Sequence, residues 1–277
     1  MTFNIRKRTA VAILGLAMSF AQTTIEAQPG QGGGVRFAQS NDPRVENRTY
    51  QFTDTGEQMP YCVFVSSKVS NDKENPLILS LHGLGIGPGF MCQGSAIDLA
   101  EEGGYVLAAP MGYSTGGWYG SPVMEGRGQS AAPPENLAEL SEKDVLNVLA
   151  MLREEFNIDD DRTYLMGHSM GGAGTFFLGS RHAGEWAALA PIAPASMLMN
   201  DNRDEILQQI KEAGVPIHLV VGTEDRLMDT ARLWAGTIED LDIEHEYIEI
   251  EGADHGSVIE QGMADIFAFF EQHRRFE

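Results

Sequence analysis

The chain has 277 residues, of which 40 are acidic and 19 are basic, and its formal net charge is −21. Hydrophobic residues make up 43% of the sequence, which excludes an intrinsically disordered chain and is enough to bury a sizeable core. The acidic excess excludes a general nucleic-acid binder, because no surplus of lysine and arginine is left to neutralise phosphates. It also argues against docking on an anionic membrane surface.

The N-terminus has the pattern of a secretory signal peptide. Basic residues 6–8 precede an uncharged run over 9–18, and residues 19–21 (Ser-Phe-Ala) supply the small side chains of a cleavage site. We therefore predict that residues 1–21 are removed, with Ala27 as an alternative end. The run is too short to span a bilayer and no cysteine follows it directly, so no membrane anchor is expected. We expect the mature protein to be secreted, into a periplasm or the extracellular space.

A glycine-rich stretch over residues 28–34 follows, so we interpret residues 22–47 as a flexible leader and residues 48–277 as the folded domain. The chain has two cysteines, Cys62 and Cys92. Export to an oxidising compartment permits a disulfide between them, and two separate buried thiols are the alternative. Both stay open, because spacing alone does not show that the two side chains meet.

From residue 48 onward, short apolar runs alternate with amphipathic stretches. Strands are expected at residues 61–65, 77–81, 105–109, 162–166, 187–192, 216–221 and 245–250. Helices are expected at residues 141–156, 173–181 and 258–274, the first with Ser141 and Asp144 in an N-terminal capping arrangement. Short apolar strands separated by helices predict an α/β fold in one domain, with a mostly parallel sheet and helices on both faces.

The stretch from Pro110 to Leu140 is long for a connection inside a compact domain, and such connections are usually functional or mobile. It is rich in glycine, serine and proline, and it contains Trp118 and Tyr119. Because it leaves the sheet after the strand at 105–109, we expect these two aromatic side chains to contribute to substrate binding. The alternative is that Trp118 anchors the loop to the core.

The strongest motif is Gly-His-Ser-Met-Gly-Gly over residues 167–172, between an expected strand and an expected helix. Gly-x-Ser-x-Gly in that setting is a strained strand-to-helix turn that lifts the serine hydroxyl above the sheet. The glycines are needed because the residues two positions either side of the serine approach too closely for side chains. We therefore predict that Ser169 is a nucleophile. The following amide, on Met170, points toward the helix N-terminus and is predicted to stabilise an oxyanion.

A serine hydroxyl is a poor nucleophile without a general base, and seven histidines compete for that role. His255 follows the last expected strand and precedes the last helix. Loops at the carboxyl ends of strands form the sites of open α/β sheets. His168 lies inside the turn itself, and the other five lie within or at the ends of expected strands and helices. The predicted base is therefore His255.

The base needs a carboxylate that fixes its tautomer and stabilises the imidazolium. Asp225 follows the strand at 216–221 and therefore stands at the same edge of the sheet. Three other carboxylates are less suitable. Glu224 is one position away and points elsewhere, and Asp229 begins the next helix. Asp254 is expected to be a solvated loop residue. The predicted triad of Ser169, Asp225 and His255 has the chain order of α/β-hydrolases.

The second oxyanion donor is expected from the loop after an early strand. Residues 82–85 (His-Gly-Leu-Gly) are suitable, because small residues let the backbone approach a substrate oxygen. The Leu84 amide is the candidate and the Gly85 amide the alternative, while His82 is expected to hold the loop. No cysteine and histidine spacing suggests zinc, and the loop lacks the third glycine of a dinucleotide site. We therefore expect no metal and no cofactor.

Four segments carry a family resemblance: Leu81-His-Gly, Asp161-Arg-Thr-Tyr-Leu-Met-Gly-His-Ser-Met-Gly-Gly, Gly222-Thr-Glu-Asp and Ala253-Asp-His-Gly. Through them, residues 75–277 resemble the α/β-hydrolase superfamily, so residues 48–277 are expected to be an α/β-hydrolase domain. The segments look like those of feruloyl-esterase and polyhydroxybutyrate-depolymerase-like secreted esterases and of related predicted peptidases. The serine turn is also similar to that of cutinase-like polyester hydrolases. The resemblance implies an eight-stranded type of sheet and metal-free ester hydrolysis.

These inferences predict a secreted serine carboxylesterase that hydrolyses short-acyl or aryl esters through an acyl-enzyme. The alternatives are a serine peptidase of the prolyl-oligopeptidase type, a cutinase-like polyester hydrolase, and a noncatalytic binding protein, against which the complete triad argues. The expected partner is a small-molecule or polymeric ester substrate, with no nucleic acid and no membrane anchor. The oligomeric state does not follow from the sequence.

Overall fold

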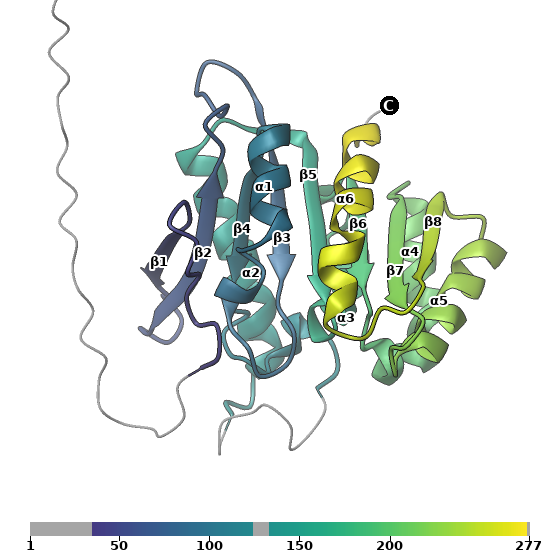
Figure 1. The fold of residues 1–277 in the computed structure, drawn as a ribbon. Coiled ribbons are helices and arrows are strands. Elements are labelled where there is room, and N and C mark those ends of the chain that lie inside the picture. Colours follow the sequence, from purple (N-terminus) through teal and green to yellow (C-terminus); the bar gives the residue numbers. More distant parts are fainter. Residues whose placement is uncertain (1–34, 124–132, 276–277) are drawn as a thin grey trace, which may run out of the picture. The chain divides into compact units, whose positions relative to one another are not determined.

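The described residues, 35–123 and 133–275 of this computed structural model, form one sheet of eight strands (Figure 1). The strands lie in the spatial order β1-β2-β4-β3-β5-β6-β7-β8. Their bounds are β1 Glu46–Gln51, β2 Gln58–Val65, β3 Asn75–Leu81, β4 Val106–Pro110, β5 Ile158–His168, β6 Ala188–Ile192, β7 Ile217–Gly222 and β8 His245–Ile250. β2 pairs antiparallel with both β1 and β4, whereas the remaining pairs are parallel. The parallel strands therefore end at one common edge.

Six α-helices of the described chain cover both faces of this sheet. Their bounds are α1 Ser95–Gly103, α2 Leu137–Glu155, α3 Met170–Arg181, α4 Arg203–Glu212, α5 Met228–Asp240 and α6 Ser257–Gln272. α1 and α6 pack on the face that is nearer the viewer in Figure 1, and α2, α3, α4 and α5 pack mainly on the other. This confirms the predicted α/β fold, with a mostly parallel sheet and helices on both faces.

The middle of the sheet is apolar because helices cover it on each side. β3, β4, β6 and β7 are buried at every residue, which is typical of parallel strands between two helical layers. The outermost strand, β1, has the polar sequence Glu-Asn-Arg-Thr-Tyr-Gln and was not predicted. α1 and α4 were not predicted either, because both are short.

The described part of the predicted leader is held against the domain. The amide of Gly87 donates to the carbonyl of Arg36 at 2.8 Å, and the amide of Gly89 donates to the carbonyl of Phe37 at 3.0 Å. The prediction of a flexible leader does not fit this part of the chain, because Arg36 and Phe37 are hydrogen-bonded to the turn after β3 and Glu46 and Asn47 pair with β2. The predicted domain start at residue 48 is too late for the same reason.

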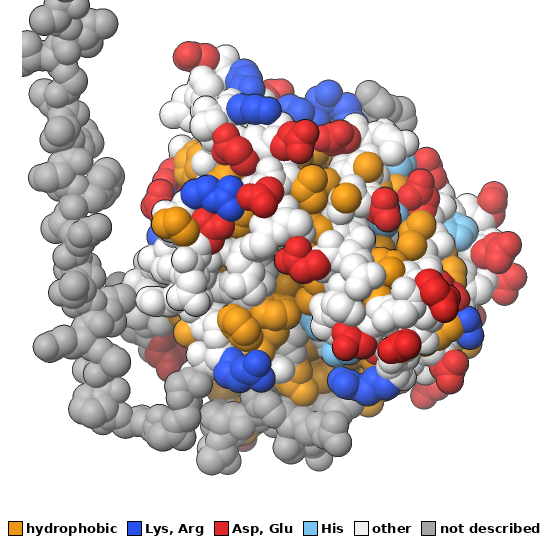
Figure 2. Space-filling model, viewed as in Figure 1, with side chains coloured by type: hydrophobic (Ala, Val, Ile, Leu, Met, Phe, Trp, Pro, Cys, Tyr) orange, Lys and Arg blue, Asp and Glu red, His pale blue; other side chains and the backbone are white. Residues whose placement is uncertain are grey.

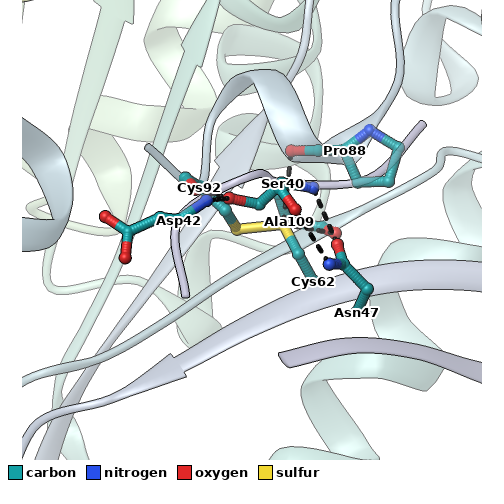
Figure 3. The surroundings of a disulfide bond; sticks show 7 residues. All are labelled: Ser40, Asp42, Asn47, Cys62, Pro88, Cys92 and Ala109. Carbon is teal, nitrogen blue, oxygen red and sulfur yellow. Dashed lines mark hydrogen bonds between the residues drawn. A yellow bond between two sulfur atoms is a disulfide. The ribbon is translucent and has the colours of Figure 1, made fainter. Parts of the chain in front are cut away.

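Cys62 and Cys92 form a disulfide, which decides between the two alternatives that the sequence left open (Figure 3). Cys62 lies in β2, and Cys92 closely follows the short 3₁₀ turn η1 (Pro88–Phe90). The Ser40 hydroxyl donates to the Cys92 carbonyl at 2.5 Å, so the N-terminal segment meets the same place. The disulfide therefore fixes the turn that follows the predicted oxyanion loop to the antiparallel side of the sheet.

The predicted signal peptide and the first part of the leader, residues 1–34, lie outside the described residues, so both stay predictions. Residues 124–132 of the long connection after β4 also lie outside them. Among the helices that the structure does describe, none has both the length and the apolar composition that crossing a bilayer needs.

Candidate active site

Ser169 stands at the sharp turn between β5 and α3, at the edge where the parallel strands end. Its backbone lies at φ 59° and ψ −111°, a strained conformation for a residue with a side chain. The flanking glycines allow this turn. A Cβ on Gly167 would lie 2.3 Å from the Gly171 carbonyl oxygen, and a Cβ on Gly171 would lie 2.1 Å from that of Leu81. The Ser169 hydroxyl is thus raised above the sheet, as the motif predicts.

Two loops bring the predicted base and acid to Ser169. His255 lies between β8 and α6, and its Nε2 is 3.0 Å from Ser169 Oγ. Asp225 lies between β7 and α5, and its Oδ2 is 2.7 Å from His255 Nδ1. Both are hydrogen-bond distances. The three residues therefore form one continuous hydrogen-bonded chain in the order serine, histidine, aspartate.

The carboxylate of this chain is shielded from solvent, whereas the imidazole is partly open to it. The Asp225 side chain is fully buried, and that of His255 is 24% exposed. Burial by itself raises the pKa of Asp225, but hydrogen bonds from His255 and from the Leu227 amide (2.8 Å) outweigh it, and the pKa lies below its ordinary value. Asp225 is therefore an anion at neutral pH. An anion there holds the proton on His255 Nδ1 and leaves Nε2 free to accept from Ser169.

None of the three rival carboxylates takes the place of Asp225. The Asp254 carboxylate accepts hydrogen bonds from the Ser257 hydroxyl, the Ser257 amide and the Gly256 amide, which tie it to the start of α6. Glu224 and Asp229 are exposed, and within the described ranges neither is bonded to a triad side chain. The geometry thus favours Asp225 as the acid.

The two amides expected to bind an oxyanion are available for that role. Met170 is the first residue of α3, where amide groups have no intrahelical partner. The Leu84 amide has no backbone acceptor in the part of the chain that is described. The Gly85 amide, the alternative, donates to the Thr115 carbonyl at 2.8 Å. The structure therefore favours Leu84 over Gly85 as the second donor.

His82 holds the loop that carries Leu84, as expected from the sequence. Its ring is fully buried, with Nδ1 2.9 Å from the Gly83 carbonyl oxygen and Nε2 2.8 Å from the Met111 carbonyl oxygen. Burial lowers the pKa of His82, so the ring is neutral and donates one of these two hydrogen bonds. The loop after β3 is thereby tied to the end of β4.

Trp118 and Tyr119 do not line a substrate site, and the structure contradicts that prediction. Their side chains are 2% and 0% exposed, and both belong to the apolar core. The Tyr119 hydroxyl donates to the His82 carbonyl at 3.1 Å, and the Tyr119 amide donates to Ser141 Oγ at 2.9 Å. A fully buried ring cannot contact a substrate, so both residues are anchors of the loop, which was the alternative for Trp118.

Ser141 and Asp144 do not cap a helix, contrary to the sequence-based expectation. α2 begins one turn earlier, at Leu137, and both residues lie inside it with fully buried side chains. Ser141 Oγ donates to the Gly112 carbonyl at 2.6 Å, and Asp144 Oδ2 accepts from the Gly112 amide at 2.7 Å. The Tyr50 hydroxyl donates to Asp144 Oδ1 at 2.5 Å. These two side chains therefore position the turn after β4, which in turn contacts the oxyanion loop.

The buried carboxyl of Asp144 is expected to make stability depend on pH. Burial raises its pKa to about 6 from the ordinary 3.8, although the hydrogen bonds that it accepts lower it. The folded state therefore holds this proton more tightly than the unfolded state. Its contribution to stability is complete below the unfolded pKa and is lost as the pH rises through the folded pKa.

We expect the free energy of unfolding of the wild type, relative to Asp144→Asn, to fall by about 3 kcal/mol between roughly pH 3 and pH 7. The asparagine does not titrate, so subtracting its stability at each pH isolates the Asp144 proton. Urea unfolding of both proteins across this range measures the difference. A difference that stays constant with pH would contradict the prediction.

His168 is a residue of the site that sequence reasoning set aside. Its Nε2 lies 2.7 Å from the His255 carbonyl oxygen, and the two rings lie 4.6 Å apart. Burial, and then the neighbouring His255, lower its pKa to about 4, so His168 is neutral at pH 7 and donates from Nε2. It therefore supports the backbone of the base. The sequence could have placed His168 in the site, because it directly precedes Ser169 in a turn that faces the loop carrying His255.

The described residues contain no group of three or more histidine, cysteine, aspartate or glutamate side chains placed to hold a metal ion. The side chains that the structure does assemble are a nucleophile, a base and an acid, with two backbone amides nearby. Such a set can attack a carbonyl carbon and stabilise the negative charge that develops on its oxygen. The arrangement is therefore suited to acyl transfer.

Comparison with known sequences places this geometry in context. A family model described as a putative esterase matches residues 53–257, a range that contains all three triad residues. A bifunctional acetylxylan esterase/xylanase of Neocallimastix patriciarum is 28% identical over 156 residues. That match covers 56% of this chain and 20% of the relative, so this chain spans about a fifth of that protein's length.

Solved structures share the fold. An S-formylglutathione hydrolase from Agrobacterium tumefaciens superposes with a TM-score of 0.66 at 17% identity, covering 82% of this chain and 94% of that one. A ferulic acid esterase from Anaeromyces mucronatus, solved with ferulic acid, has a TM-score of 0.64 at 18% identity, covering 86% and 94%. Because the identity is this low, the structural likeness shows the fold alone.

Proposed function

Because the chain belongs to the putative esterase family, we propose that it is a carboxylic ester hydrolase that works through an acyl-enzyme on Ser169. The Ser169 hydroxyl attacks the ester carbonyl carbon while His255 Nε2 takes its proton. The carbonyl oxygen becomes an oxyanion and accepts hydrogen bonds from the Leu84 and Met170 amides. Asp225 stabilises the imidazolium that forms.

The tetrahedral intermediate then expels the alcohol. The bond between the carbonyl carbon and the alcohol oxygen breaks as His255 gives its proton to that oxygen, and the acyl group stays on Ser169. A water molecule next attacks the acyl carbonyl while His255 takes a proton from it. The second intermediate releases the acid as the proton returns to Ser169 Oγ. Each cycle consumes one ester and one water and leaves the enzyme unchanged.

The observation that carries this proposal is the continuous hydrogen bonding from Ser169 Oγ through His255 to Asp225, with distances of 3.0 and 2.7 Å. A nucleophile, its base and the group that orients the base are all in place before any substrate binds. The strained backbone of Ser169 supports the same conclusion, because strain of this kind is concentrated at functional positions.

We propose short-acyl and aryl esters as the substrates. The sequence relative is named for acetylxylan, a short-acyl ester, and one structural neighbour is named for ferulic acid, an aromatic acid. The connection between β6 and α4 also supports small substrates. It is described in full and consists mainly of the 3₁₀ segment η4 (Ser196–Asn202), which leaves no room there for the helical lid of a lipase.

A common acyl-enzyme predicts products that do not depend on the leaving group. Phenyl acetate and 4-nitrophenyl acetate should each be hydrolysed in buffer that contains methanol as a competing nucleophile. The ratio of methyl acetate to acetate is expected to be the same for both, because both pass through one acetyl-enzyme. A ratio that changes with the leaving group would contradict the mechanism.

The matched amide, 4-nitroacetanilide, should react far more slowly than 4-nitrophenyl acetate. Comparable rates for the amide and the ester would favour a serine peptidase of the prolyl-oligopeptidase type.

We infer that the chain is exported before it acts. The signal-like pattern of residues 1–21 supports this, as does the Cys62–Cys92 disulfide, because such bonds persist in oxidising compartments. Mass analysis of protein recovered outside the cytoplasm should find Gln22 or Gln28 as the first residue. Intact chain that begins at Met1 and stays in the cytoplasm would contradict export.

A further inference from the structure

Two arginines lack the carboxylate partner that every other described arginine has. The described residues contain eleven arginines, and nine of them form an ion pair with an aspartate or a glutamate. The two exceptions are Arg36 and Arg226, and both are exposed. Carboxylates are plentiful in a chain with 40 acidic residues, and they are spread over the face shown in Figure 2. Arg226 directly follows the triad residue Asp225, whereas Arg36 pairs with Ile86 in the loop after β3.

Arg226 stands next to the acid–base half of the triad. It directly follows Asp225, whose carboxylate is 2.7 Å from the His255 ring. The pKa of His168, which burial lowers most, is lowered further by the charges of His255 and Arg226, so the guanidinium acts electrostatically within the site. The His168 ring in turn lies 4.6 Å from that of His255. The free cation of Arg226 is therefore on the His255 side of the nucleophile.

Arg36 stands on the side of the oxyanion loop. Its backbone pairs with Ile86, which belongs to the loop after β3. Its guanidinium lies 5.5 Å from the centre of the Phe37 ring, which is 5.2 Å from the Phe90 ring. The Phe90 ring is 6.0 Å from that of His168. Two aromatic rings, those of Phe37 and Phe90, thus lie between the Arg36 guanidinium and His168.

The carboxylates near Arg226 in the sequence do not neutralise it. Asp225 is committed to the triad histidine and a backbone amide, and Asp254 is committed to the start of α6. Glu224 and Asp229 are exposed, and in the described ranges neither forms an ion pair with Arg226. The guanidinium therefore keeps its N–H donors for a group that arrives with the substrate.

We propose that this esterase prefers esters whose alcohol part carries a carboxylate, and that Arg226 binds that carboxylate. The proposal rests on the proposed function, because it uses the direction in which the alcohol leaves. His255 protonates the leaving oxygen, so the alcohol part lies on the side where Arg226 stands. A guanidinium fork matches the two oxygens of a carboxylate. In a protein of net charge −21, a local cation offsets the general repulsion of anions.

Two pairs of esters test this preference. 4-Acetoxybenzoate and methyl 4-acetoxybenzoate share the acetyl group and the ring, and only the first carries a carboxylate on the alcohol part. 4-Nitrophenyl hemisuccinate and 4-nitrophenyl butanoate place the same difference on the acyl part. The quantity compared is kcat/KM of a variant divided by that of the wild type. This ratio cancels the intrinsic reactivity of each ester.

Arg226→Gln is expected to lower kcat/KM for 4-acetoxybenzoate by about tenfold, mainly through KM, and to lower that for its methyl ester by at most about twofold. Arg36→Gln removes the other arginine without a carboxylate partner and should lower the value for the same anion by at most about twofold. Lys73→Gln is the control. Lys73 is exposed and precedes β3 at the end opposite to the oxyanion loop, so its substitution removes one charge far from the site and should change neither ester.

Equal losses on 4-acetoxybenzoate and its methyl ester would overturn the proposal. A loss confined to the hemisuccinate would also overturn it, because the carboxylate would then lie on the acyl part. Lys73→Gln effects as large as those of Arg226→Gln would show that net charge alone is responsible, with the same consequence. If the wild type hydrolysed the two neutral esters, but each variant changed kcat/KM equally for the carboxylate-bearing ester and its neutral counterpart, only this inference would fall. If it hydrolysed none of the four, the proposed function would fall first.

Discussion

Replacing Ser169 with alanine is expected to lower kcat for ester hydrolysis by about 10⁴-fold or more. The substitution removes the attacking oxygen and leaves the base, the acid and the oxyanion amides in place. The fold should tolerate the substitution, because the hydroxyl gives up no more than its hydrogen bond to His255. Such a bond is worth about 1 kcal/mol, which shifts the melting temperature of a domain of this size by about 3 °C. Activity and thermal unfolding should be measured on the same preparation.

A fluorophosphonate probe separates chemistry from folding in this experiment. The wild type should be labelled at one site per chain and Ser169→Ala at none. Ser180→Ala is the matched control, since Ser180 lies near the other end of α3 and its hydroxyl donates to the Phe177 carbonyl. That variant should be labelled and active like the wild type. Substantial activity in Ser169→Ala would refute the acyl-enzyme on this residue.

The triad could be predicted because its signals are local or topological. Ser169 follows from the close approach of Gly167 and Gly171, which any chain making this turn requires. Asp225 and His255 follow from their places directly after strands, because parallel strands deliver the loops at their carboxyl ends to one edge of the sheet. None of these inferences needed to know which distant side chains pack together.

The predictions that failed depended on such distant contacts. From the sequence, aromatic residues in a long glycine-rich loop are equally compatible with lining a substrate site and with packing into the core to hold the loop. Only the burial of Tyr119 between His82 and Ser141 separates the two. Ser141 and Asp144 are residue types that favour helix N-termini, and nothing local shows that they face the turn after β4 instead. The start of the domain was misjudged for the same reason, since nothing local in the sequence shows that the backbone at Arg36 and Phe37 is hydrogen-bonded to the turn after β3.

Asp225→Asn tests whether Asp225 is the carboxylate that orients His255. The asparagine keeps the shape of the side chain and an oxygen for the Leu227 amide, so the loop after β7 should stay in place. It removes the negative charge that stabilises the His255 imidazolium. It can also present its NH₂ group to Nδ1, which places the ring proton on Nε2, where it no longer accepts from Ser169.

We expect Asp225→Asn to lower kcat by about 10⁴-fold at neutral pH, with little change in KM, because the charge acts on the transition state more than on the bound ester. Asp229→Asn is the matched control: it makes the same chemical change four residues along, on the exposed first turn of α5, and should leave kcat within about twofold of the wild type. Steady-state kinetics on one neutral aryl ester compares all three proteins. Were Asp229→Asn the more damaging change, the carboxylate that orients His255 in solution would be Asp229, and the hydrogen bond of 2.7 Å to Asp225 would not be the functional one.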